Sequence, residues 1–378
     1  MLALPQHLRL IVAECRQGGR MCSASSTAIV TGSLGLVGAA TVRKLCALGL
    51  EVIGTDNDQR RHFFGDAASN AAMQAVLEKH CATYRHRTLD IRDHDAMTAL
   101  IATLGSNLSV IVHAAAQPSH DWATQDPLTD FAINAQATLG LLDVWRRHAP
   151  EALFLFTSTN KVYGDRPNDL PLTDLGTRLE IDPAHPFHAR GIDESLSIDQ
   201  TRHSLFGVSK TAADLMVQEY ALRFGLRSVV FRAGCLTGEG HKGVKSHGFL
   251  AYLCAVARAG GDYEVIGHGG KQVRDNLHAD DLADAFCRVL LGRGPAGVYN
   301  IGGGRRGSCS VLEALEIAAE VRGHPVAHHF SHTARYGDHA WWITDTRRFE
   351  ADYPGWSPTY SARELIERLL AQGLAEPG

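Results

Sequence analysis

Short apolar runs alternate with stretches of helical periodicity from about residue 27 onward. Residues 27–31 (T-A-I-V-T) predict a buried strand, residues 39–50 predict a helix with glycine at its end, and residues 51–56 (E-V-I-G-T-D) predict a second strand. Continuous apolar runs are typical of parallel strands that are covered on both faces, and they recur at residues 108–116, 152–159 and 227–232. The pattern therefore predicts an α/β fold with a doubly wound parallel sheet and a functional site at the carboxyl ends of its strands.

The alternation becomes less regular after Arg232. Residues 247–260 predict an amphipathic helix that ends in glycine, and residues 263–277 predict a hairpin around G-H-G-G. We therefore divide the chain into an extension without an assigned role, a large sheet domain and a smaller C-terminal α/β lobe. These parts span residues 1–26, 27–232 and, mainly, 233–378.

A glycine-rich turn, G-S-L-G-L-V-G at residues 32–38, joins the first predicted strand to the first predicted helix. Gly32 allows a tight turn, Gly35 allows the backbone to approach a pyrophosphate, and Gly38 allows the helix to pack closely on the strand. Asp56 ends the second strand, where a carboxylate accepts ribose hydroxyls and repels a 2′-phosphate. The large domain is therefore predicted to be of Rossmann type and to bind NAD rather than NADP. The turn adds Leu36 and Val37 to the predicted cofactor site.

Composition and charge exclude several classes of protein. The 378 residues carry a net charge of −4 without a basic stripe, which argues against a nucleic-acid partner, and no apolar run approaches the length of a membrane span. The eight cysteines form no C-x-x-C pair, so we expect reduced thiols and a cytoplasmic protein. The histidines at 324–332 lack a recurring ligand spacing, so we expect no metal.

Several motifs together resemble the extended short-chain dehydrogenase/reductase family, which contains sugar-nucleotide epimerases and dehydratases. They are the glycine turn, L-D-I-R-D (89–93), H-A-A-A (113–116), I-N-A-Q-A-T (133–138) and G-K-Q-V-R-D-N-L-H-A-D-D-L (270–282). The resemblance implies that NAD stays bound through each catalytic cycle, and that Asn134 has a structural role. It adds Asp90, Ile91, Ala114, Ala115 and Ala116 to the expected cofactor contacts.

Within this family, S-T-N-K-V-Y-G-D (158–165) is most similar to CDP-paratose 2-epimerases, also called CDP-tyvelose epimerases. The resemblance implies that Thr159 and Asn160 contact the substrate. The family's dehydratases carry an acid pair where this chain has Asn160 and Lys161, and elimination of water requires such an acid/base pair. The motif therefore favours an epimerase over a dehydratase.

One position departs from the family pattern. The family carries Tyr-x-x-x-Lys, in which the lysine lowers the pKa of the catalytic tyrosine; here Lys210 is present but Phe206 replaces the tyrosine. Lys210 retains its expected role of holding the nicotinamide ribose. His203, Ser204 and Lys161 are the alternatives for the missing acid/base, and the sequence does not decide among them.

The predicted substrate is a nucleotide-diphosphate hexose with CDP or UDP. Arg274 and Arg335 are the candidates for its diphosphate, because a guanidinium binds two phosphate oxygens at once; the alternative for Arg274 is an ion pair with Asp275 or Asp338. Cys235 stands where the family often has a substrate-contacting Asn, and we interpret it as a packing residue or a weak acid beside the sugar. The resemblance also implies a homodimer or higher homo-oligomer, through helices near 121–148 and 209–224.

Three hypotheses for the function follow. The first is an NAD-dependent epimerase that oxidises its sugar transiently to a ketosugar, in nucleotide-sugar and cell-surface polysaccharide biosynthesis. The second is a dehydratase or another atypical oxidoreductase on the same scaffold. The third is a protein that binds NAD or a sugar nucleotide without catalysis, and Phe206 is its main support.

Overall fold

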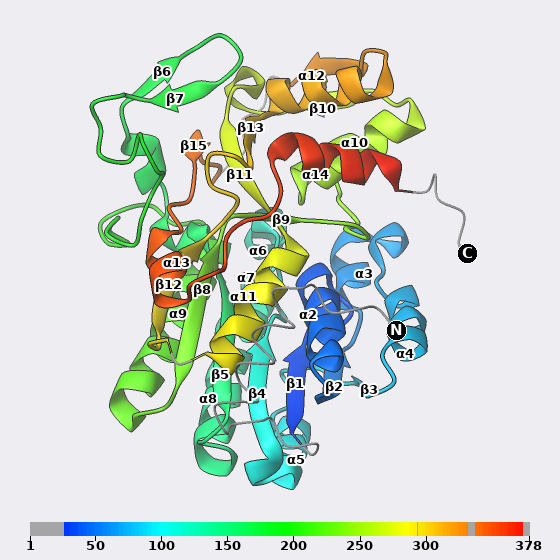
Figure 1. Ribbon diagram of the computed structural model, residues 1–378, viewed down its shortest axis with the longest axis vertical. Coiled ribbons are helices and arrows are strands. Elements are labelled where there is room, and N and C mark those ends of the chain that lie inside the picture. Colours follow the sequence, from blue (N-terminus) through cyan, green and yellow to red (C-terminus); the bar gives the residue numbers. More distant parts are fainter. Residues whose placement is uncertain (1–25, 293, 332–336, 373–378) are drawn as a thin grey trace.

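The computed structural model describes residues 26–292, 294–331 and 337–372. A parallel sheet of seven strands, in the order β12-β8-β5-β4-β1-β2-β3, forms its centre (Figure 1). These strands are β1 (Thr27–Thr31), β2 (Glu51–Asp56), β3 (Tyr84–Thr88), β4 (Leu108–His113), β5 (Leu153–Thr159), β8 (Ser228–Ala233) and β12 (Gly297–Ile301). The chain runs outward from β1 to β3 and then returns to the other side of β1, which places a topological switch point between β1 and β4. The predicted doubly wound sheet is confirmed.

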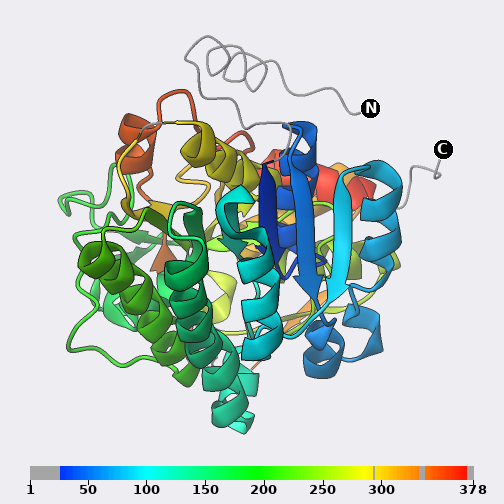
Figure 2. The same ribbon diagram turned by 90° about the horizontal axis from the view of Figure 1, so that it is seen from below.

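Helices cover both faces of this sheet (Figures 1 and 2). Alternate residues of β1 face opposite layers: Ala28 and Val30 belong to the cluster beneath α2, whereas Ile29 packs with α5, α8 and α9. Both clusters are almost fully buried, which explains the unbroken apolar runs in the sequence. The helices of the large domain are α2 (Leu36–Ala47), α3 (Gln59–Phe64), α4 (Ala72–His80), α5 (His94–Leu104), α6 (His120–Gln125), α7 (Pro127–Phe131), α8 (Ala137–His148) and α9 (Leu205–Phe224).

The sheet domain also receives segments from beyond residue 232. Strand β12 pairs in parallel with β8, and α11 (Ala279–Leu291) packs against α2. Helix α13 (Arg347–Asp352) adds Phe349 to the same core cluster. The chain therefore crosses between the two lobes more than once, and the boundary that we expect at residue 232 stays a prediction.

The smaller lobe is built around β11 (Val273–His278), which pairs with β9 (Cys235–Thr237), β13 (Ser308–Ser310) and β15 (Trp341–Trp342). Strand β10 (Tyr263–Val265) pairs instead with β14 (His328–Phe330). The predicted hairpin is thus wrong: the G-H-G-G stretch forms a short 3₁₀ turn, and the two strands that flank it have different partners. The helices of this lobe are α10 (Phe249–Ala259), α12 (Val311–Arg322) and α14 (Ala362–Ala371).

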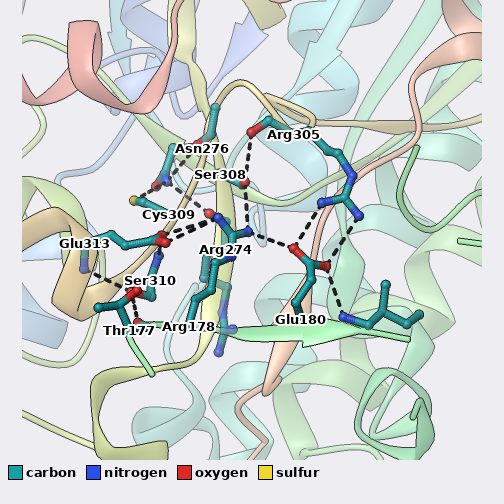
Figure 3. A network of polar contacts seen from close by, with 12 residues as sticks. Thr177, Arg178, Glu180, Arg274, Asn276, Arg305, Ser308, Cys309, Ser310 and Glu313 are labelled. Carbon is teal, nitrogen blue, oxygen red and sulfur yellow. Dashed lines mark hydrogen bonds and ion pairs between the residues drawn. The ribbon is translucent and has the colours of Figure 1, made fainter. Parts of the chain in front are cut away.

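A two-stranded arm, β6 (Leu172–Asp174) and β7 (Leu179–Ile181), extends from the large domain and docks on the smaller lobe. Figure 3 shows the polar network that holds it. Arg178 lies between Glu180, at 3.3 Å, and Glu313 of α12, at 3.4 Å, and Arg305 reaches Glu180 at 3.0 Å. The Oγ of Ser310 donates to the carbonyl of Thr177 at 2.7 Å. These polar contacts add to an apolar one, because Ile181 of the arm packs with Val273, Trp341 and Trp342 of the smaller lobe.

Within the described segments, no helix combines the length and the apolar character that are needed to cross a bilayer.

Candidate active site

The glycine turn forms a cradle at the switch point of the sheet. Gly32 has a φ of +68°, and a Cβ there would lie 2.8 Å from the backbone nitrogen of Ala115. A Cβ on Gly38 would lie 2.0 Å from the carbonyl oxygen of Gly32. Only glycine fits these two positions, so helix α2 begins directly over the end of β1, with its first amide groups directed at the space where a pyrophosphate binds.

Asp56 lies at the carboxyl end of β2, in the same cavity as the glycine turn. Its carboxylate accepts hydrogen bonds from the backbone nitrogens of Leu34, at 3.0 Å, and Asp58, at 2.8 Å. Burial raises the pKa of this carboxyl above its usual value. The backbone bonds fix its orientation, and they hold it beside the turn as a ribose-binding carboxylate requires.

Other residues that we predicted for the cofactor line the same cavity. Asp90 accepts a hydrogen bond from the side chain of Asn57 at 2.8 Å and is paired with Arg92, so its position is fixed from two sides. Asn134 lies in a π-helical turn at Ala132–Gln136 and accepts from the backbone of Gln117 at 3.0 Å. The cavity lining also includes Gly35, Leu36, Val37, Ile91, Ala114, Ala115 and Ala116.

Lys210 projects from α9 toward the end of β5. Its Nζ donates to the carbonyl oxygen of Thr157 at 2.9 Å and lies 4.3 Å from the centre of the Phe156 ring. Burial lowers the pKa of Lys210 to about 8, although Asp214 and Asp130 oppose the shift. Lys210 is therefore a buried amine at the cavity wall that loses its proton more readily than an exposed lysine does.

Phe206 lies in the first turn of α9 and lines the cavity with 7% of its surface exposed. Its ring makes an edge contact with the imidazole of His120, with 5.0 Å between the ring centres. The side chain offers no proton, so the aromatic surface of a tyrosine is present at this position without its hydroxyl.

Two of the proposed substitutes for tyrosine, His203 and Ser204, make hydrogen bonds with backbone atoms outside the cavity. The Nε2 of His203 is 2.8 Å from the carbonyl oxygen of Val162, and Ser204 caps α9 by accepting from the nitrogen of Gly207 at 3.0 Å. Neither residue lines the cavity. Lys161 does line it, and its Nζ donates to the carbonyl oxygen of Gly337 at 3.0 Å. Burial lowers the pKa of Lys161 to about 8.

The end of β5 contributes Thr159 and Asn160 to the cavity. The Oγ1 of Thr159 accepts from the nitrogen of Lys161 at 3.2 Å, which fixes its orientation. Tyr163, in contrast, is buried away from the cavity and donates to Asn300 at 2.8 Å. The motif at residues 158–165 therefore places Thr159 and Asn160 in the cavity and Tyr163 in the packing between the domains.

The smaller lobe contributes Cys235 and Arg274 to the opposite side of the cavity. Arg274 is buried and forms an ion pair with Asp338, and its Nη1 donates to the carbonyl oxygen of Val273 at 2.8 Å. Burial raises the pKa of Cys235 to about 11, so its thiol stays protonated near neutral pH. Arg335 lies outside the described residues.

The cavity lining includes parts that sequence reasoning missed, among them His120 and the segment from Gly240 to Phe249. His120 follows Q-P-S directly after H-A-A-A at the end of β4, so its place after a site-forming strand was a usable signal. The contact between His120 and Phe206 has no signature in the sequence, because these residues are far apart along the chain. In the described part of the molecule, no group of three His, Cys, Asp or Glu side chains is arranged to hold a metal.

The lining residues named above surround one cavity of about 460 Å³ between the two lobes. The glycine turn, the placement of Asp56 beside it and the switch point are those of a Rossmann-type protein whose cofactor is NAD. The model of the NAD dependent epimerase/dehydratase family matches residues 28–302, and the chain belongs to that family.

Several relatives cover almost the whole chain. CDP-paratose 2-epimerase of Salmonella typhi is 29% identical, over 90% of this chain and 97% of its own length. UDP-glucose 4-epimerase of Halalkalibacterium halodurans is 28% identical, over 89% of this chain and 92% of its own. The crystal structure of UDP-glucose 4-epimerase from Bifidobacterium longum, in complex with NAD⁺ and UDP, superposes with a TM-score of 0.73 at 23% identity, covering 91% of this chain and 97% of that one. The relatives are thus epimerases, and the structural likeness extends over both lobes.

Proposed function

We propose that the protein is an NAD-dependent epimerase of a CDP- or UDP-hexose, with a reaction like that of CDP-paratose 2-epimerase, and that it serves nucleotide-sugar and cell-surface polysaccharide biosynthesis. The observation that carries the proposal is the continuity of one cavity from Asp56, at the dinucleotide end, to Arg274 in the smaller lobe. Such a cavity suits two nucleotide-containing molecules that meet near Thr159 and Lys210. The likeness to Salmonella typhi CDP-paratose 2-epimerase supports the choice of reaction.

We assign each side chain a role that agrees with its place in the cavity. When bound, NAD accepts a hydride from a sugar carbon and returns it. Lys210, at the wall of the cavity, holds the nicotinamide ribose, and Thr159 bonds a sugar hydroxyl. Arg274 faces the diphosphate while Asp338 fixes its guanidinium plane. Cys235 stays a neutral packing and hydrogen-bonding group, because burial holds the pKa of its thiol at about 11.

The residues at the end of β5 also favour epimerisation over loss of water. Asn160 and Lys161 line the cavity, and neither supplies the carboxylic acid that dehydration requires. The reaction we propose therefore changes the configuration of one carbon and leaves the mass of the sugar unchanged.

A self-associating surface fits the same proposal. Large apolar side chains on the outer face of α8 and α9 are exposed; they are Leu139, Leu205, Val208, Leu215 and Leu222. We expect two copies to pair through these helices, which analytical ultracentrifugation of wild type and Leu215→Glu would test. A monomeric wild type would contradict this part of the proposal.

The test of the reaction uses purified protein with NAD and a panel of CDP- and UDP-hexoses that includes CDP-paratose. We expect NAD in the deproteinised extract, and proton NMR to show a second epimer of equal mass. Lys210→Ala abolishes turnover, whereas Lys79→Ala, an exposed position on α4, does not. A wild type that leaves every sugar unchanged contradicts the proposal, and a product lighter by one water favours the dehydratase instead.

Phe206 favours a second candidate, a protein that binds NAD and a sugar nucleotide without turnover. It predicts calorimetric binding of both ligands by the wild type together with a complete absence of product. The two candidates therefore separate in the same experiment, because both require binding and only the first requires chemistry.

A further inference from the structure

The proposed reaction needs a group to take a proton from the reacting sugar hydroxyl, and Phe206 cannot do so. The inference that follows rests on the proposed epimerase function. The replacement must lie in the cavity beside the Phe206 ring, because hydride transfer and proton transfer occur at the same carbon and its oxygen. It also needs a proton affinity suited to neutral pH.

His120 is in ring contact with Phe206 and lines the same cavity as Thr159 and Lys210. It is half-buried and occupies the first position of α6. An imidazole can both accept and donate a proton. His120 therefore places a basic ring directly against the aromatic surface that has lost its hydroxyl.

A buried polar network fixes the backbone that carries His120. The Oγ of Ser119 caps α6 by accepting from the nitrogen of Trp122 at 3.2 Å. Ser119 is held by Gln117, whose Nε2 donates to its carbonyl oxygen at 2.8 Å and to Asp130 at 2.7 Å. These side chains are almost fully buried, so they maintain one arrangement.

The same network reaches the helix that carries Phe206. The Nδ2 of Asn134 lies 2.9 Å from Asp130 and 3.2 Å from the Oγ of Ser209 on α9. Helix α6 and the first turns of α9 are therefore joined through buried hydrogen bonds, which hold the ring of His120 at a set position relative to residue 206.

The segment at Gly337 closes over the other side of the imidazole. Gly337 has a φ of +71°, and a Cβ there would lie 3.0 Å from the Nδ1 of His120. The carbonyl of Gly337 holds Lys161, and Asp338 follows directly. Lys161, Asp338 and Asp121 are charged residues that line the same cavity as His120.

We propose that His120 is the catalytic acid/base that replaces the missing tyrosine. In the oxidation step the O–H bond of the sugar hydroxyl breaks, its proton moves to the imidazole, and its electron pair forms the C=O bond. The hydrogen on the same carbon leaves with two electrons as a hydride to oxidised nicotinamide. Return of the hydride to the ketosugar, with the proton from His120, restores the dinucleotide and the imidazole.

The two lysines of the cavity serve this chemistry by position and charge. The Nζ of Lys210 is directed to Thr157 at the end of β5, and the Nζ of Lys161 to Gly337. Each Nζ therefore donates to a backbone carbonyl that fixes its position at the cavity wall. The ring contact with Phe206, where the tyrosine hydroxyl is missing, belongs to His120.

The test compares His120→Gln with His80→Gln, a matched change at the exposed end of α4, in the NAD-loaded protein. The probe is whichever of CDP-paratose, CDP-glucose and UDP-glucose the wild type converts. General acid/base catalysis contributes about 10² to 10⁴ in rate, so we expect kcat of His120→Gln to fall about 10²-fold or more, with KM changed by less than about threefold. The double variant His120→Gln/Phe206→Tyr places a phenol beside Lys210. We expect its kcat to exceed that of His120→Gln by at least about tenfold.

A second measurement does not depend on turnover. In ¹⁵N-histidine NMR of the NAD-loaded wild type, the imidazole signals that are missing from His120→Gln should shift when the probe is added, while those of His80 should not. His120→Asn repeats the kinetic test, and thermal unfolding verifies that both variants fold.

The possible failures can be told apart. A wild type that is active while His120→Gln keeps its kcat within about threefold overturns the role of His120 and leaves the proposed function intact. Unmoved His120 signals overturn it as well, as does a loss of kcat that appears only in Lys161→Met. A wild type that converts none of the three probes overturns the proposed function, and the role of His120 with it.

Discussion

The charge of Lys210 is costly to bury, and its removal gives a quantitative prediction. The side chain is 3% exposed, and burial lowers its pKa from 10.5 to about 8. In the NAD-free protein, the unfolded chain therefore binds a proton more tightly at this site than the folded chain does. Stability contributed by the neutral amine is present above about pH 10.5 and is lost as the pH falls toward 8.

The size of the effect follows from the shift. A depression of about 2.5 pH units corresponds to about 3 kcal/mol, of which about 2 kcal/mol lies between pH 7.5 and pH 10. Lys210→Met keeps most of the side-chain volume but does not titrate. It also loses the hydrogen bond to Thr157, which is worth about 1 kcal/mol at any of these pH values. We expect the variant to be more stable than the wild type near pH 7.5, and we expect this advantage to disappear by about pH 10.

The assay is urea unfolding of the NAD-free wild type and Lys210→Met at a series of pH values, followed by fluorescence. Other titrating groups, including Lys161, are common to both proteins and cancel in the difference between their free energies of unfolding. A difference that changes by less than about 0.5 kcal/mol over this range would refute the argument, because the lysine would then be equally easy to charge in the folded and the unfolded chain.

Two further predictions concern the cofactor cradle and the arm. Gly38→Ala places a Cβ 2.0 Å from the carbonyl of Gly32, so we expect calorimetry to show NAD binding weakened at least about 100-fold. Gly297→Ala on β12, where a Cβ comes no closer than 3.7 Å to any residue beyond its chain neighbours, should weaken it far less. Glu180→Gln removes the anion that Arg178 and Arg305 share, at a cost of about 1 to 3 kcal/mol, and limited proteolysis within residues 165–204 should accelerate about tenfold. Asp174→Asn, which breaks an exposed pair with Lys271, is the matched control and should change cleavage little; equal rates in both variants would contradict a special role for the network.

The parts of the site that depend on local structure could be predicted from the sequence. The glycine turn, Asp56 and Lys210 belong to single βα units or helices, where spacing along the chain determines spacing in the fold. For an ion pair of Arg274, the sequence offered two partners, Asp275 and Asp338. The structure shows the pair with Asp338, which depends on the position of a segment far along the chain. The role of Arg274 toward a diphosphate stays a prediction.

The predicted hairpin and the missed histidine share one physical cause. Strand β10 is followed by a tight turn but pairs with β14, a strand far along the chain, because an unpaired strand edge can pair with any strand that folding brings beside it. His120 reaches Phe206 because α6 packs against α9, a contact between elements that no local pattern records. Long-range contacts of this kind decide which of several plausible polar side chains faces the substrate.

The chain keeps Lys210 although Phe206 replaces the family's tyrosine. This bears on whether the protein is an epimerase or binds its ligands without turnover. In the family pattern the lysine stabilises a phenolate, and with Phe206 that partner is absent while the cost of burying the amine remains. A cost of this size indicates selection for a ligand contact, such as ribose hydroxyls, which both a catalyst and a binder would need. The two therefore differ at the proton acceptor. His120 touches the Phe206 ring, so the loss of the tyrosine hydroxyl does not by itself exclude a catalyst.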